Sequence, residues 1–90
     1  MLESQIESRL VQAVKAKGGL AIKLNPMSLA GIPDRLVLLP GGRIVFVELK
    51  APGKKPRRVQ EVRHNQLRSL GFEVLVIDSV EMIIREICTT

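Results

Sequence analysis

The stretch Arg43-Ile44-Val45-Phe46-Val47-Glu48-Leu49-Lys50 is the most informative part of this 90-residue chain. Its apolar run, Ile44–Val47, indicates a strand that is covered on both faces and therefore lies inside a sheet. Alternation along the strand places Glu48 and Lys50 on one face and Leu49 on the other. Charge is costly next to such an apolar run unless it has a purpose. The pattern therefore predicts a polar site at the end of a central strand.

A second acid, Asp34, lies at the start of another predicted strand, residues 35–39. Pro40-Gly41-Gly42 is a strong turn signal between that strand and the apolar one, so we expect an antiparallel hairpin. Since one strand begins at Asp34 and its antiparallel neighbour ends near Glu48, the two carboxylates should lie at the same end of the sheet.

The residues at this end of the hairpin are suited to a divalent metal ion and a phosphodiester. Mg²⁺ prefers oxygen ligands and needs only one or two carboxylates besides water and substrate phosphate. Asp34 and Glu48 supply these carboxylates, and the backbone carbonyl of Leu49 is a third candidate ligand. Lys50 could orient or activate an attacking water, or neutralise charge on phosphorus. The alternative is that Asp34 caps a turn and that Glu48 pairs with Lys50 on a solvated strand end.

The other elements follow from hydrophobic periodicity and from turn residues. We expect them at these positions: a helix over residues 3–17, a strand over 20–24, a loop over 25–33, a helix over 57–70, a strand over 72–77 and a C-terminal helix capped by Ser79. The order is helix, three strands, helix, strand, helix. It predicts an α/β sandwich with a mixed central sheet flanked by helices, formed by residues 1–90 as a single domain.

Basic residues outnumber acidic ones by 14 to 9, which gives a net charge of +5. We therefore expect the partner to be a polyanion such as DNA. The alternative is a basic protein with incidental charge. Clustering favours DNA, because many candidate phosphate-binding residues follow the apolar strand. The candidates are Lys54, Lys55, Arg57, Arg58, Arg63 and Arg68, with Lys23 on the first strand.

Three further observations limit the function. Cys88 has no cysteine partner for a disulfide, and its place near the end of the last helix favours packing. His64 has no histidine or cysteine at metal-ligand spacing, which favours a surface position on its helix. No apolar stretch is long enough to span a bilayer and no secretory signal is recognisable, so we expect a soluble, cytoplasmic protein without a membrane partner.

The motif Gly31-Ile32-Pro33-Asp34, followed by Val47-Glu48-Leu49-Lys50-Ala51-Pro52-Gly53 and by Gln60 at the start of a helix, resembles the VRR-NUC family of the PD-(D/E)xK nuclease superfamily. The similarity extends over nearly the whole chain and is greatest to small stand-alone members of the kind found in phages. It implies a restriction-endonuclease-like fold and hydrolysis of phosphodiester bonds with Mg²⁺, for which Mn²⁺ can substitute. It also implies branched DNA as substrate, no small-molecule cofactor, and a homodimer that acts like a Holliday-junction resolvase.

The resemblance assigns roles to individual residues: Asp34 and Glu48 match the metal-binding acids, Lys50 matches the catalytic lysine, and Gln60 matches a glutamine next to the site. Family members also place a glutamate on the first helix. Glu3 and Glu7 both qualify, and Glu3 is favoured because it lies closer to the apolar stripe of that helix. Both could instead be ordinary acids in the first turns, favoured by the helix dipole. The competing function is a DNA-binding module without catalysis on the same fold.

Overall fold

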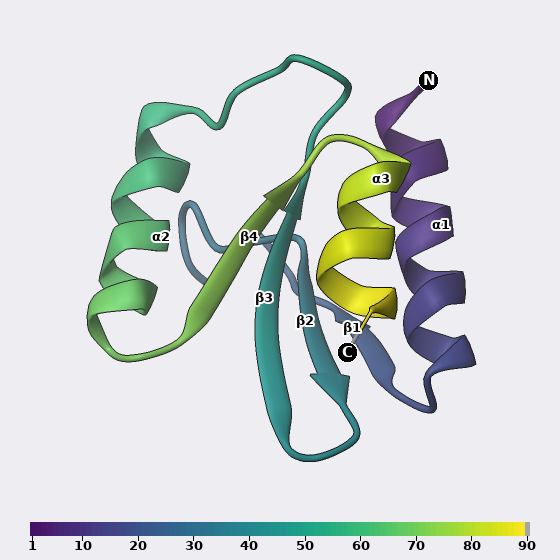
Figure 1. Cartoon of the computed structure of the whole chain (residues 1–90). Coiled ribbons are helices and arrows are strands. Elements are labelled where there is room, and N and C mark those ends of the chain that lie inside the picture. The colour runs from purple at the N-terminus through teal and green to yellow at the C-terminus, as the bar shows by residue number, and fades with distance from the viewer. Residues whose placement is uncertain (90) are drawn as a thin grey trace.

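The computed structural model describes residues 1–89 and contains one mixed sheet of four strands in the order β1-β2-β3-β4 (Figure 1). The strands are β1 (Leu20–Lys23), β2 (Arg35–Leu39), β3 (Arg43–Leu49) and β4 (Glu73–Ile77). β1, β2 and β3 pair antiparallel in sequence order, and β4 adds to β3 in parallel. The predicted hairpin and the central position of its second strand are both confirmed.

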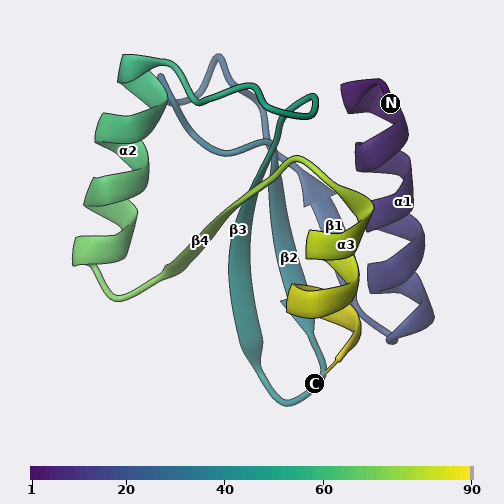
Figure 2. The ribbon, with the colours of Figure 1, turned by 45° about the horizontal axis from the view of Figure 1, so that its top comes forward.

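Three helices lie on the two faces of this sheet (Figures 1 and 2). α1 (Glu3–Ala16) and α3 (Val80–Ile83) pack on one face, and a π-helical turn, η1 (Ile84–Cys88), continues α3. α2 (Arg58–Ser69) lies on the opposite side, next to β4. The predicted α/β sandwich and its element order are confirmed, although the π-helical end was not expected.

The hydrophobic core lies between the sheet and the pair α1 and α3. Its fully buried members come from both helices, from η1 and from three strands: Ile6, Leu10, Val14, Val37, Val45, Val47, Leu49, Ile77, Ile83 and Ile87. Burial of each such side chain contributes about 1.5–3 kcal/mol. α2 adds none of these residues, and its own buried side chains are Gln60 and His64. One face of the sheet therefore carries most of the folding energy.

Local signals account for most element boundaries. Gly71 follows α2 with φ of +97°, a conformation that favours glycine, so the helix ends where predicted. Ser79 Oγ accepts a hydrogen bond from the Met82 N–H at 3.2 Å, which confirms it as the cap of α3. Phe72 was predicted to begin the last strand but precedes β4 and is exposed, with its ring packed edge-on against Phe46.

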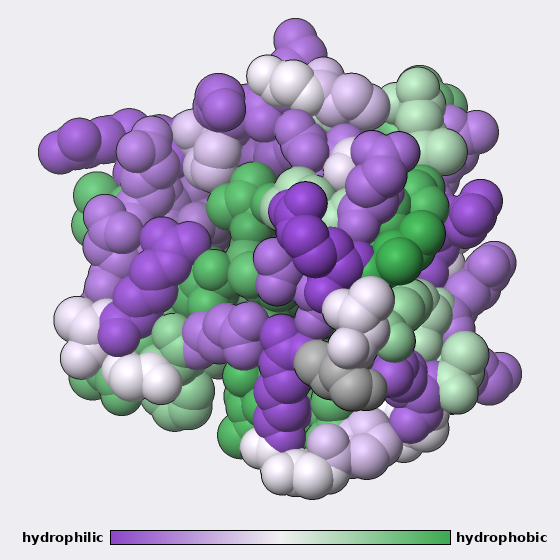
Figure 3. Space-filling model, in the orientation of Figure 1, coloured by the Kyte–Doolittle hydropathy of each residue, from purple (hydrophilic) through white to green (hydrophobic). Residues whose placement is uncertain are grey.

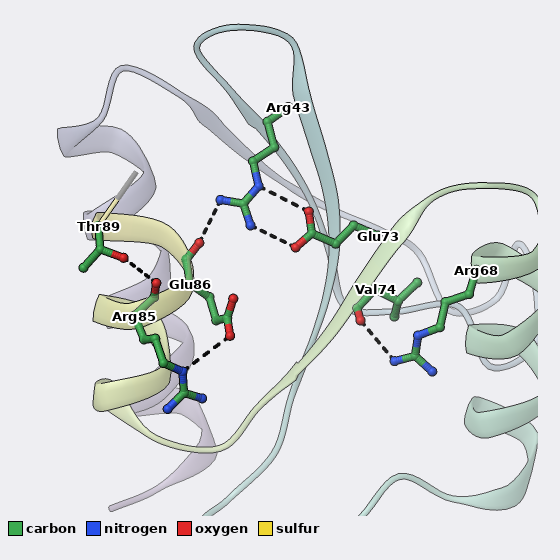
Figure 4. Close-up of polar contacts among 7 residues, drawn as sticks. All are labelled: Arg43, Arg68, Glu73, Val74, Arg85, Glu86 and Thr89. Carbon is green, nitrogen blue, oxygen red and sulfur yellow. Dashed lines mark hydrogen bonds and ion pairs between the residues drawn. The ribbon is translucent and has the colours of Figure 1, made fainter.

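Arg43 joins the hairpin to the C-terminal part of the chain (Figure 4). Its guanidinium donates to both Glu73 carboxylate oxygens, at 3.2 and 2.9 Å, and to the Glu86 carbonyl at 2.8 Å. Arg68 donates to the Val74 carbonyl at 3.0 Å and so connects α2 with β4. Cys88 is exposed at the end of η1, whereas its position near the end of the last helix had favoured packing.

The outer face of the sheet, opposite α1 and α3, is also apolar. Cross-strand pairing brings six apolar residues of β1, β2 and β3 together, and we call them the outer apolar face: Leu20, Ile22, Leu36, Leu38, Ile44 and Phe46. Because α2 packs over β4, several of these side chains remain exposed. Figure 3 shows hydrophobic surface between α2 and the sheet and beside the lower part of β3. Within residues 1–89, no helix has the length and hydrophobicity needed to cross a bilayer.

Candidate active site

Asp34 and Glu48 lie side by side at one end of the sheet. Arg35 on β2 is the cross-strand partner of Val47 on β3, and the next position along this ladder brings the two acids together. Asp34 Oδ2 accepts a hydrogen bond from the Leu49 N–H at 2.9 Å, while the Asp34 carbonyl accepts one from the Leu24 N–H at 2.9 Å. Asp34 is therefore held from both sides.

The Glu48 carboxylate is only 2% exposed and is contacted by several polar groups. Gln60 Nε2 donates to Oε2 at 2.9 Å, and Lys50 Nζ lies 3.3 Å from the same oxygen. Burial and, to a smaller extent, the charge of Asp34 raise the pKa of Glu48 to about 7, and Lys50 opposes the rise. Glu48 and Lys50 do form the ion pair of the alternative prediction, but the strand end is not solvated.

Gln60 and His64 face Glu48 from successive turns of α2. Residues separated by four positions lie on the same side of a helix, so both side chains point toward the sheet. Gln60 Oε1 also accepts a hydrogen bond from the Arg57 N–H at 2.8 Å, which caps the helix that carries it. His64 Nε2 lies 3.7 Å from Glu48 Oε1. The prediction that His64 occupies a surface position was wrong, because the inner side of α2 is polar.

The loop between β1 and β2 is fixed against α2. Gly31 has φ of +77°, and a Cβ there would lie 2.3 Å from the Val59 carbonyl oxygen. Arg63 Nε donates to the Ala30 carbonyl at 2.9 Å. The close approach of loop and helix explains the glycine in the motif before Asp34. It also positions Asp34 relative to Gln60.

Comparison with known proteins identifies this arrangement. No family model matches the sequence. A solved structure described as a VRR_NUC domain has a TM-score of 0.88 to this chain, with 34% sequence identity, over 97% of this chain and 95% of that one. This chain belongs to the VRR-NUC family. A further relative is "Putative nuclease p44" of Acyrthosiphon pisum secondary endosymbiont phage 1, which is 48% identical over 80 residues, 89% of this chain and 86% of that protein.

The two candidate acids on α1 of this VRR-NUC chain have different surroundings. Glu7 Oε2 accepts a hydrogen bond from Arg35 Nε at 2.9 Å, and Arg35 Nη1 also donates to the Ala21 carbonyl at 3.0 Å. Glu3 is exposed on the first turn, and its charge contributes to the raised pKa of Glu48. Glu3 is thus within electrostatic range of the site, whereas Glu7 is engaged with β2.

The basic residues divide into exposed and engaged groups. The exposed ones are Lys54, Lys55 and Arg57 on the connection from β3 to α2, and Arg58 at the start of α2. Figure 2 shows this connection at the same end of the sheet as the β1–β2 loop. Lys23 is exposed at the end of β1, while Arg63 and Arg68 donate to backbone carbonyls. The VRR-NUC domain therefore presents positive charge next to its acidic pair.

The donor set of this VRR-NUC site fits a hard cation. Across residues 1–89, no three His, Cys, Asp or Glu side chains are arranged to hold a metal ion. The candidate site instead combines the carboxylates of Asp34 and Glu48 with the Leu49 backbone. Glu48 Oε1 is buried without a hydrogen-bond partner, and the charges of Asp34 and Glu3 add to the negative charge around it. Both features favour a divalent cation with oxygen ligands.

Proposed function

We propose that this VRR-NUC domain is a metal-dependent endonuclease that hydrolyses phosphodiester bonds in branched DNA, as a homodimer that acts like a Holliday-junction resolvase. The observation that carries the proposal is the convergence of Asp34, Glu48 and Lys50 at one end of the sheet, with Glu48 buried. The name of the phage relative, a putative nuclease, supports the reaction class. The motif resemblance supports the choice of branched DNA.

Asp34, Glu48 and the Leu49 carbonyl would hold Mg²⁺, or Mn²⁺ in its place. When bound, such an ion supplies a Lewis acid for the phosphate and lowers the pKa of a water molecule. Gln60 holds Glu48 Oε2, and the Leu49 N–H holds Asp34 Oδ2, so each acid is oriented before any ligand arrives. Fixed ligands of this kind reduce the cost of assembling the site.

Lys50 is the group suited to act on the reacting atoms. Its ammonium lies 3.3 Å from Glu48 Oε2 and is partly shielded from solvent, so it can hold an attacking water or neutralise charge that develops on phosphorus. In the reaction a water oxygen bonds to phosphorus, one P–O ester bond breaks, and the leaving oxygen takes up a proton. Glu3 could hold a further water from the first turn of α1.

The exposed basic residues are suited to bind the DNA backbone. Lys54, Lys55 and Arg57 lie on the connection that leads from the site to α2, and Arg58 begins that helix. Contacts of this type position phosphates and do not read bases. They also make affinity dependent on salt. With two Phe and no Trp or Tyr, the chain has little capacity for stacking on bases.

The outer apolar face is a candidate surface for the second subunit. It exposes Leu20, Ile22 and Ile44 on the side of the sheet that also carries Glu48. Contiguous apolar surface of this kind is typical of protein interfaces. Two sites related by a two-fold axis would suit two symmetric cuts in a junction.

A cleavage assay on a labelled four-way junction tests the activity. We expect nicks with Mg²⁺ or Mn²⁺, none with chelator, and much less cleavage of linear duplex. Glu48→Gln is expected to abolish cleavage while leaving DNA binding largely intact. Salt-sensitive binding that metal does not convert into nicking would instead identify a DNA-binding module without catalysis.

Analytical ultracentrifugation tests the proposed dimer. We expect a two-subunit species for the unmodified protein and a monomer for Ile22→Lys, because a charged side chain in the interface has no partner there. Lys15→Gln, on the exposed side of α1, is the control and should remain dimeric. A monomeric unmodified protein that cuts junctions would contradict the dimer but not the nuclease activity.

A further inference from the structure

The interior of the site contains an unusual pair of atoms. Within residues 1–89, the buried side-chain nitrogen and oxygen atoms without a hydrogen-bond partner are Glu48 Oε1 and His64 Nε2. They face each other at 3.7 Å, and both side chains are 2% exposed. Leaving a buried polar group unsatisfied costs about 1–3 kcal/mol. The two unsatisfied atoms therefore need an explanation other than stability.

Packing alone does not require a histidine at this position. An apolar side chain would avoid the cost of an unsatisfied nitrogen, and elsewhere the buried face of the sheet is built from valine, leucine and isoleucine. The neighbouring buried residue of α2 is Gln60, which already donates to the other oxygen of Glu48. Both inward-facing residues of α2 thus point at one carboxylate.

We propose that His64 is a positioning residue for Glu48, whose Nε2–H donates a hydrogen bond to Glu48 Oε1 when metal and DNA assemble the site. The inference rests on the proposed function. A direct hydrogen bond requires the two atoms to approach by less than 1 Å, to about 2.8–3.0 Å. Contacts in enzyme sites are often long before ligands bind and tighten in the complex.

The contact would hold the oxygen of Glu48 that has no hydrogen-bond partner among residues 1–89. Gln60 and Lys50 contact Oε2, whereas Oε1 accepts no hydrogen bond from residues 1–89. A hydrogen bond from His64 would hold Oε1 as well, so that both oxygens of the carboxylate are positioned. The imidazole must carry its hydrogen on Nε2 to do so, since a bare nitrogen would face the carboxylate lone pairs.

Two amide substitutions separate positioning from packing. The amide nitrogen of glutamine corresponds in reach to His64 Nε2, whereas that of asparagine is one methylene shorter. His64→Gln should therefore retain the contact, and His64→Asn and His64→Leu should lose it. Asn65→Ala, at the next and exposed position of α2, is the control. All variants are first compared by thermal unfolding in chelator. This measurement distinguishes variants that fold less stably from variants that only bind metal more weakly.

Metal binding is the first measurement and does not depend on cleavage. In titration calorimetry with Mn²⁺, His64→Leu and His64→Asn should bind about 10-fold more weakly than the unmodified protein, within the range found for residues that orient metal ligands. His64→Gln and Asn65→Ala should bind within about 3-fold of it. On a four-way junction, kcat should fall in the same order while KM for DNA stays nearly constant.

Each outcome decides the inference. Unchanged Mn²⁺ affinity in His64→Leu and His64→Asn would overturn it, as would equal losses in the glutamine and asparagine variants, which would indicate packing. No Mn²⁺ binding by the unmodified protein would also overturn it. If Mn²⁺ binding follows the expected order but no DNA is cut, the positioning role stands and the proposed nuclease function fails.

Discussion

Replacing Glu48 with glutamine is expected to stabilise the metal-free protein at pH 8 and to leave its stability nearly unchanged at pH 5. The Glu48 carboxyl is buried, and burial together with Asp34 raises its pKa from the ordinary 4.5 to about 7. The unfolded chain releases this proton above pH 4.5, whereas the folded protein retains it until about pH 7. Ionisation of Glu48 therefore opposes folding, increasingly so between these two values and constantly above pH 7.

The size of the effect follows from the pKa. Each unit of pKa difference between the folded and unfolded protein corresponds to 1.36 kcal/mol. The cost of ionised Glu48 to folding is therefore about 3 kcal/mol at pH 8 and below about 1 kcal/mol at pH 5. Glutamine keeps the shape and can still accept the hydrogen bond from Gln60, but it loses the ion pair with Lys50. We therefore expect a net gain of about 2 kcal/mol at pH 8. For a domain of this size this raises Tm by about 10 °C.

Thermal and urea unfolding in chelator, at constant ionic strength from pH 5 to 8, measure this gain. His64 also makes stability depend on pH, because burial lowers its pKa and its protonation opposes folding at acidic pH. Its contribution is present in both proteins and largely cancels in the difference. A difference between variant and unmodified protein that does not change with pH, or a variant that is less stable at pH 8, would refute the reasoning.

Three further predictions concern the loop, the helix cap and the basic connection. In urea unfolding, Gly31→Ala should lower the free energy of unfolding by at least about 2 kcal/mol more than Gly41→Ala does. Both glycines have positive φ, but only Gly31 lies against α2. Gln60→Leu should cost about 1–2 kcal/mol through the lost helix cap and reduce junction cleavage by about 10-fold or more. Lys54→Gln combined with Lys55→Gln should lower the slope of log affinity against log salt by about 2 in DNA-binding titrations.

Each of these has a result that would count against it. Equal losses for the two glycine variants would mean that the loop is free to move from α2. Exposed Gln66→Leu is the control for Gln60→Leu, and equal effects would exclude a special role for Gln60. An unchanged slope of log affinity against log salt would show that Lys54 and Lys55 do not contact the DNA.

The sequence was sufficient to predict the fold and the meeting of the two acids. Alternation, the Pro40-Gly41-Gly42 turn and the apolar run Ile44–Val47 are local signals, and each constrains a neighbouring pair of strands. Pairing then follows from the hairpin alone, which is why Asp34 and Glu48 were expected together. Gln60 was found through the family motif and not through periodicity.

The prediction was wrong where the buried side of an element is polar. His64 was assigned to the surface because no histidine or cysteine lies at metal-ligand spacing from it, yet α2 turns Gln60 and His64 inward and leaves Val59 and Val62 exposed. The separation of four residues between Gln60 and His64 would have revealed their shared side. Arg63 was predicted to bind DNA, and its contact with the Ala30 carbonyl depends on a loop conformation that no local signal specifies.

The concentration of the buried core on one side of the sheet has a consequence for local unfolding. α2 is held by the Gln60 hydrogen bond to Glu48, by two arginine contacts to backbone carbonyls and by the packing of Gly31, and it contributes none of the core residues. Segments with few buried apolar contacts open before the rest of a protein, so the backbone amides of α2 should exchange with solvent faster than those of α1. A ligand that binds Glu48 would then protect a whole helix from exchange.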